Sequence, residues 1–489
     1  MPQEASKKPS PFATDVLKLV SGTAVAQVIA ILASPILTRL YGPEAFGLLA
    51  LFTSITGIIG VIACMRYELA IMLPKDDKDS INILGLCFLM VTIITVITGI
   101  GLFLGSGALL SVLHAQDLAP FIWLVPPFIF VSGLFLALNY WNSRTRHYGR
   151  LSIARVTSAV TTTGTQLGAG FGGFPTGGSL IGASLVGSIV STGILGGQIW
   201  REDGASIKRA VSWKGIVAGL KRYKKFPLID SFSALLNTIS WQLPVLLLSA
   251  FFSPVIVGFY ALGMRVLQTP MSLIGGAIAQ VFFQRAAEAK REGTLDILVE
   301  NVFRVLVIIG LFPILILTLI GGDLFSVVFG GLWQDAGIFA QILGIWTFIW
   351  FISSPLSTIY IILEKQDFGF QYNVANLITR LLSLIIGGIM QSVYIALFLF
   401  GLSGIIVYGY LCLSMMKFSG VSWSRLKKII LPHLFYFTPI GALLIGLKIF
   451  NFNSIFLVFI ACIITIIYYL YILKTDTQLR TILNQVRLS

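Results

Sequence analysis

The sequence is poor in charged residues, and acidic residues are the scarcest of them. Of its 489 residues, 11% are charged, with 20 Asp and Glu against 34 Lys and Arg. A soluble globular chain carries roughly 25% charged residues, so an ordinary water-soluble domain is excluded. There are only three histidines and four cysteines. No CxxC pair or histidine-rich cluster predicts a metal site.

Motifs for nucleotide chemistry and catalysis are also missing. There is no GxxxxGK loop, and the three histidines are scattered. The glycine cluster at 168–173 follows an apolar segment, so we interpret it as a helix end. The net charge of +14 would favour nucleic acid in a soluble protein, but here its placement fits membrane topology. We therefore expect no cofactor, no metal and no nucleic-acid partner.

Long apolar runs dominate what is present. Hydrophobic residues make up 56% of the chain, and runs of 18 or more recur, each long enough to cross a hydrocarbon core of ~30 Å as a helix. The predicted fold class is an all-α polytopic membrane protein with about 14 transmembrane helices. They are placed at 16–38, 45–73, 81–105, 119–142, 151–172, 177–200, 227–250, 256–285, 299–322, 336–363, 371–391, 393–416, 430–448 and 454–473.

The basic residues indicate the orientation of these helices. An even number of crossings puts both termini on one side, and nearly all loop Lys and Arg lie on that side. The opposite loops hold only Arg39 and Lys448 near their edges. Because cytoplasmic loops carry the excess of basic residues, we expect both termini in the cytoplasm. Residues 1–15 are then a polar cytoplasmic tail, with no cleavable signal.

An internal repeat predicts two lobes. Residues 41–51 and 252–262 share the pattern aromatic-x-Pro-x-x-x-Gly-x-x-Ala-Leu. Pro suits a helix start and Gly allows close helix packing. Tyr148-Gly149 and Phe368-Gly369 form a weaker pair. We therefore expect that a six-helix unit is duplicated without inversion. The predicted parts are 16–200 (first six-helix lobe), 201–226 (linker), 227–416 (second lobe), 417–473 (two extra helices and a basic loop) and 474–489 (cytoplasmic tail).

The linker at 201–226 is basic and amphipathic, with Trp213, Ile216 and Leu220 among its lysines. Two interpretations remain open. The segment either lies on the anionic inner leaflet or is plain cytoplasmic charge between two halves.

Two arginines are predicted to lie deep in the membrane. Arg265 follows Pro254 by eleven residues, and Arg380 lies at a similar depth in its segment. Burying a charge in the bilayer costs ~2.5 kcal/mol or more, so such residues face a cavity or a partner. An interhelical pair is one interpretation. The other is a substrate cavity, because the guanidinium fork binds phosphate and diphosphate oxygens in bidentate fashion.

The remaining candidates are placed nearer the helix ends. Arg66 and Glu68 are two residues apart, so on a continuous helix they need not pair. With Asp230 they are candidates for a cytoplasmic gate or an ion-coupling site, the alternative being interfacial snorkelling or capping. Further candidates for substrate binding are Arg39, Arg155, Arg304, Gln242 and Asn237. Each of these is also explained as a structural contact between helices.

The run LTRLYGPEAFGLLAL, followed by MRYELAIMLPKDDKD, resembles the opening of bacterial polysaccharide-biosynthesis flippases of the Wzx type. These belong to the superfamily that also contains the MATE exporters and the lipid II flippase MurJ. The resemblance implies inner-membrane translocation of an undecaprenyl-diphosphate-linked oligosaccharide (an O-antigen, capsule or exopolysaccharide repeat unit) from the inner to the outer leaflet. It implies alternating access through a cationic cavity, with possible proton or sodium coupling. The lipid II branch has cavity arginines in its first two helices, which this chain lacks except for Arg39 and Arg66.

Two other functions are kept as alternatives. One is a MATE-like, cation-coupled exporter of small amphiphiles, although such a protein would be expected to have acids deep in the membrane. The other is a polymerase of lipid-linked repeats, an enzyme that would be expected to fold a larger outward loop than residues 321–335. We expect a transporter without covalent catalysis. Its partners would be the lipid-linked glycan, membrane lipids and a polysaccharide polymerase.

Overall fold

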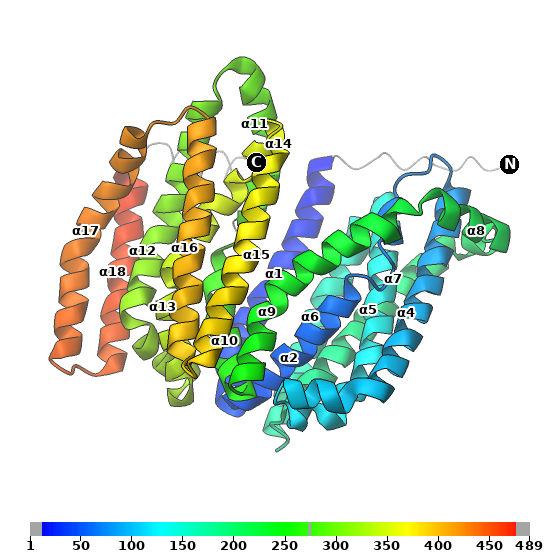
Figure 1. Cartoon of the computed structure of the whole chain (residues 1–489), viewed down its shortest axis with the longest axis horizontal. Helices are drawn as coiled ribbons and strands as arrows, with labels where there is room; N and C mark the ends of the chain where they lie inside the picture. Colours follow the sequence, from blue (N-terminus) through cyan, green and yellow to red (C-terminus); the bar gives the residue numbers. More distant parts are fainter. Residues whose placement is uncertain (1–11, 272–274, 476–489) are drawn as a thin grey trace. The chain divides into compact units, whose positions relative to one another are not determined.

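The structure is a computed structural model that describes residues 12–271 and 275–475. Every regular element in these ranges is a helix (Figure 1), which confirms the predicted all-α fold. Up to the end of α9 the elements are α1 (Phe12–Leu40), α2 (Pro43–Gly60), α3 (Tyr67–Ala70), α4 (Asp77–Val112), η1 (Gln116–Leu124), α5 (Val125–Arg144), α6 (Tyr148–Phe171), α7 (Gly177–Ala210), α8 (Trp213–Arg222), η2 (Phe226–Asp230) and α9 (Ser231–Phe251).

The remaining elements begin at the second copy of the proline pattern. They are α10 (Pro254–Pro270), α11 (Gly276–Glu292), α12 (Leu295–Phe329), η4 (Gly331–Trp333), α13 (Gln334–Leu356), α14 (Thr358–Ile362), α15 (Gln366–Ile389), α16 (Val393–Phe418), α17 (Trp423–Ile449) and α18 (Ser454–Thr475). Pro43 and Pro254 are each the first residue of a helix, as the repeat predicts. Proline is suited to that position, where no N–H donor is needed.

Twelve spans in the described ranges are long and apolar enough to cross a membrane. The predicted segments 151–172 and 256–285 are not among them. The first corresponds to α6, whose 24 residues span about 36 Å. This helix is long enough to cross a membrane, but its Ser, Thr and Gly content makes it less apolar than the twelve spans. The second corresponds to α10 and α11, each of 17 residues. The protein is therefore a polytopic membrane protein.

The chain packs as two compact units that divide between Val257 and Gly258. Unit 1 is residues up to 257 and unit 2 is residues from 258. Within unit 1, α6 packs between α1 and α7, and α9 packs against α2. Residues 227–250 are predicted to open the second lobe, and the helix α9 that they form packs against α2 within unit 1.

The predicted helix at 45–73 is interrupted in the structure. α2 ends at Gly60, and the chain continues through tight turns before the short helix α3. Met65 and Arg66 have φ of 49° and 62°, a left-handed backbone that cannot continue an α-helix. Backbone N–H groups here bond three residues back, as in Ala63 to Gly60. The prediction of one continuous helix is wrong, because hydropathy does not report backbone geometry.

In unit 2 the two C-terminal helices pack on α12. The contact is an apolar cluster that includes Ile308, Ile316 and Leu444. At its centre the rings of Phe312 and Tyr468 stack 4.0 Å apart between centroids. This packing fixes α17 and α18 as part of unit 2.

Candidate functional site

Arg380 is a deeply buried arginine in unit 2. It lies on α15 with 2% of its surface exposed, and its Nη2 donates a hydrogen bond of 2.9 Å to Tyr408 Oη on α16. The guanidinium carbon lies 5.8–5.9 Å from the ring centroids of Trp346, Phe400 and Tyr408. Ring faces attract a cation and stack on the planar guanidinium. The structure therefore holds this charge in an aromatic cage.

Arg265, the other arginine predicted to lie deep, has an exposed side chain on α10. Tyr260 on the same helix is buried and lies close enough to Arg380 to interact with it electrostatically. The helix α10 thus contributes to the surroundings of Arg380 through Tyr260, while the Arg265 side chain on the same helix is accessible to solvent.

Arg66 and Glu68 form an ion pair of 3.4 Å. Glu68 lies in the chain segment that connects α2 to α4, and it is fully buried. Burial raises the pKa of its carboxyl above the ordinary value, while the charge of Arg66 lowers it. Within the described residues, Glu68 Oε2 and Arg66 Nε have no hydrogen-bond partner. The break after α2 brings the two side chains together, which an ideal helix would not do.

Asp230 was predicted to join this pair. It is exposed at the end of η2, and η2 packs against α3, the helix that carries Glu68. Tyr67 of α3 also donates a 3.4 Å hydrogen bond to the carbonyl of Leu220 in α8. The elements are therefore adjacent, and the Asp230 carboxylate remains accessible to solvent.

A clamp around Arg144 explains the charged loop that follows α3. Arg144, at the end of α5, contacts Asp77 Oδ1 at 2.9 Å. It also donates to the carbonyls of Ile71, Pro74 and Lys75 at 3.2, 2.9 and 3.4 Å. One planar guanidinium offers five donors, so a single side chain holds the whole turn. The LPKDDKD motif is thus held in place by Arg144.

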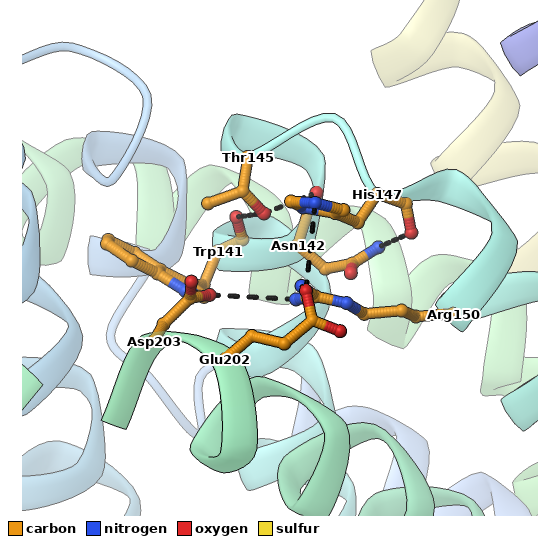
Figure 2. A network of polar contacts seen from close by, with 7 residues as sticks. All are labelled: Trp141, Asn142, Thr145, His147, Arg150, Glu202 and Asp203. Carbon is orange, nitrogen blue, oxygen red and sulfur yellow. Dashed lines mark hydrogen bonds and ion pairs between the residues drawn. The ribbon is translucent and has the colours of Figure 1, made fainter. Parts of the chain in front are cut away.

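A second polar network joins α5, α6 and α7 (Figure 2). Arg150 is 7% exposed and pairs with Glu202, and it lies 3.6 Å from Asp203. The indole Nε1 of Trp141 donates to Asp203 at 3.0 Å, and Asn142 donates to the carbonyl of His147 at 3.0 Å. The sequence does not predict the contacts of Arg144 and Arg150, since an arginine in a loop carries no signal of its partner.

Two predicted arginines of unit 1 make hydrogen bonds within that unit. Arg155 on α6 donates to Thr23 Oγ1 on α1 at 2.6 Å. Arg39 is exposed at the end of α1 and donates to the carbonyl of Pro35 at 3.0 Å. Arg155 thus links two neighbouring helices, whereas the Arg39 contact is local.

The other candidates are distributed over both units. Gln242 of α9 packs over Gly57 of α2, where a Cβ on the glycine would lie 3.1 Å from Gln242 Nε2. Gln242 is therefore part of the contact between these two helices of unit 1. Asn237, on the same helix, is exposed. Arg304 on α12 lines a pocket of unit 2. The structure thus assigns Arg265, Arg304 and Arg380 to unit 2 and the other predicted residues to unit 1.

Several acidic side chains in the described ranges pair with arginines. No group of three or more His, Cys, Asp or Glu in the described chain could hold a metal ion. Acids that form ion pairs with arginine include Glu68, Asp77, Glu202, Asp296 and Glu300.

Comparison with protein families gives one match over most of the chain. The family model described as "Polysaccharide biosynthesis protein" matches residues 36–338, which is 303 of the 489 residues. The match includes the break after α2, the Arg144 clamp and Arg265. No curated protein matches the sequence.

Solved structures share the fold. A lipid II flippase MurJ in an inward closed conformation has a TM-score of 0.68 and 11% identity, covering 92% of this chain and 98% of that one. An inward-facing MATE multidrug transporter has a TM-score of 0.59 and 15% identity, with coverage of 81% and 96%. A Vibrio cholerae MATE transporter has a TM-score of 0.53 and 13% identity, with coverage of 84% and 97%. At these identities the likeness is one of fold.

Proposed function

The chain belongs to the polysaccharide biosynthesis protein family, and from that premise we propose that it is a lipid-linked oligosaccharide flippase. It carries an undecaprenyl-diphosphate-linked repeat unit of O-antigen, capsule or exopolysaccharide from the inner to the outer leaflet of the bacterial inner membrane. Both termini lie in the cytoplasm, and a polysaccharide polymerase consumes the product. The family and the MurJ- and MATE-like fold support transport without covalent catalysis.

One observation carries the substrate assignment, the burial of Arg380 in its aromatic cage. In a low-dielectric interior the attraction between a guanidinium and a phosphate is much stronger than in water, and the planar fork matches two phosphate oxygens. Tyr408 orients the guanidinium through its 2.9 Å hydrogen bond. We assign the diphosphate or acidic sugars of the substrate to Arg380, with exposed Arg265 as the contact on entry.

The pair of Arg66 and Glu68 is assigned to ion coupling. Burial raises the pKa of Glu68, so the carboxyl takes up a proton more readily than an exposed glutamate. Protonation removes the charge that holds Arg66 at 3.4 Å and allows the α3 segment to move. Asp230, exposed on the neighbouring η2, is the acid to which Arg66 is transferred. A sodium ion would act on the same two carboxylates.

The experiment that tests this function follows the location of lipid-linked repeats in a deletion strain. A flippase defect leaves single repeats on the inner leaflet, accessible only after the membrane is permeabilised. A polymerase defect leaves single repeats on the outer leaflet. Normal surface glycan together with drug sensitivity would instead identify an exporter of small amphiphiles. Either of the last two results overturns the proposal.

A further inference from the structure

Unit 2 contains a pocket that the proposed transport path does not use. It has a volume of about 670 Å³ and lies between α12, α17 and α18. Pockets of roughly 300–1,000 Å³ are typical of small-ligand sites. The pocket lies near the first turns of α12 and α17 and the last turn of α18, which places its mouth at one end of the helices. Figure 1 shows α17 and α18 side by side.

Among the charged side chains of the lining, the basic ones outnumber the acidic ones. Arg304 on α12, with Arg425 and Lys428 on α17, faces the acid Glu300. Arg425 Nη1 lies 3.1 Å from Glu300 and 3.0 Å from Asp296, which is the other acid at this edge. The Arg425 pairs also hold the start of α17 against α12.

Neutral hydrogen-bonding groups complete the pocket. Tyr436 and Tyr471 line it, together with Asn301 and the largely buried His433. His433 Nδ1 lies 3.1 Å from the hydroxyl of Tyr468, a contact that fixes the ring. Hydroxyl, amide and imidazole groups next to arginine and lysine are the donors that a phosphate ester prefers.

Exposed apolar side chains adjoin the polar lining. Leu431 and Phe435 are 57% and 76% exposed and precede the lining residues Pro432 and Tyr436 on α17. Leu470, 56% exposed, precedes Tyr471 on α18. On a membrane helix such side chains face acyl chains. A ligand in this pocket can therefore place a charged group inside and a hydrocarbon tail along the helices.

We propose that the pocket between α12, α17 and α18 binds the phosphate of a membrane amphiphile. Basic pockets between transmembrane helices are suited to anionic lipid head groups. Arg304 and Lys428 contact the phosphate, while Tyr436 and Tyr471 donate to its ester or glycerol oxygens. The bound lipid cross-links α12 to α17 and α18. A phospholipid and a polyprenyl diphosphate present the same chemistry here.

Native mass spectrometry of the purified full chain tests this site. The probes are phosphatidylglycerol, phosphatidylcholine and undecaprenyl diphosphate, each titrated into detergent-solubilised protein. We compare wild type with Arg304→Gln and Lys428→Gln. Loss of a charge-assisted contact is expected to raise the dissociation constant about tenfold. If the variants weaken phosphatidylglycerol alone, the occupant is a bilayer phospholipid. If the variants weaken the binding of undecaprenyl diphosphate alone, the occupant is a polyprenyl lipid. If they weaken the binding of both lipids, the site recognises the phosphate that the two share.

The matched control is Lys427→Gln, which removes the same charge one residue away. Lys427 Nζ lies 5.8 Å over the Trp423 ring and is not part of the lining. Arg304→Lys keeps the charge and should retain most of the binding, which separates charge from folding. Equal lipid binding in wild type, Arg304→Gln and Lys428→Gln would overturn the proposal, as would an equal loss in Lys427→Gln. Because the readout is binding, it is independent of glycan export.

Discussion

Arg66 and Glu68 lie 3.4 Å apart as an ion pair because the chain leaves helical geometry between α2 and α3. Arg66 has a φ of 62° and is the residue that precedes α3. Its side chain is 26% exposed, whereas Glu68 is fully buried. Arg66 is therefore partly accessible to water, whereas Glu68 is not. This difference suits an ion pair that separates when Glu68 is protonated.

The first prediction concerns the pH dependence of stability. Burial raises the pKa of Glu68, so the folded protein binds this proton more tightly than the unfolded chain. Stability contributed by such a group increases as pH falls through its folded pKa and is lost as pH rises. The glutamine of Glu68→Gln does not titrate. The Tm of this variant minus the Tm of wild type should therefore be larger at about pH 8 than at about pH 5.

Thermal unfolding of detergent-solubilised protein at both pH values measures this difference. The control is Asp230→Asn, which removes an acid that is exposed rather than buried. The same Tm difference for Glu68→Gln at the two pH values would contradict the assignment.

The second prediction concerns the deep arginines. Arg380→Ala should reduce surface glycan at least tenfold, because one charge-assisted contact is worth about 1.5–3 kcal/mol. Arg380→Lys should be intermediate, because lysine keeps the charge and loses the planar fork. Immunoblotting of surface glycan measures export, and membrane fractionation checks insertion.

Exposed Lys221 on α8 provides the matched loss of one positive charge, and Lys221→Ala should export normally. The double variant Arg265→Ala with Arg380→Ala is the strictest test. Full glycan export by that variant would show that the substrate binds elsewhere.

The third prediction concerns the Arg144 clamp. Arg144→Ala removes the donor to three backbone carbonyls and should destabilise unit 1 by about 2 kcal/mol. Asp77 is 79% exposed, so Asp77→Asn should cost less than about 1 kcal/mol. Limited proteolysis of the 71–76 turn and thermal unfolding report the two effects. Equal effects of both substitutions would show that the side-chain pair, and not the carbonyl contacts, holds the loop.

The fourth prediction concerns the network of Figure 2. Arg150 is 8% exposed in its side chain and pairs with both Glu202 and Asp203, and a hydrogen bond to a charged group contributes about 1.5–3 kcal/mol. Arg150→Ala should therefore lower stability strongly. Glu202→Gln, at a side chain 58% exposed, serves as the mild control. Unfolding in denaturant measures both, and an unchanged midpoint for Arg150→Ala would exclude a structural role for the network.

Several features were predictable because they depend on local composition. The helical type of the spans follows from the apolar runs, since a hydrocarbon core admits hardly any other backbone. Pro43 and Pro254 were recognisable as helix starts because proline lacks an N–H donor. The RYELAIMLPKDD motif carried the family resemblance. The aromatic cage was not predictable, because Tyr408 and Trp346 lie in apolar runs where such rings are common.

By itself the sequence determined an all-helical membrane protein, its family resemblance, and the arginines on which a substrate site could be built. Only the tertiary structure decided which of those arginines are enclosed. It buries Arg380 against Tyr408, exposes Arg265, pairs Arg66 with Glu68 and assigns Arg144 to the charged loop. The reason is that hydropathy and spacing report depth along a single helix, whereas the environment of a charge depends on side chains from helices far apart in sequence.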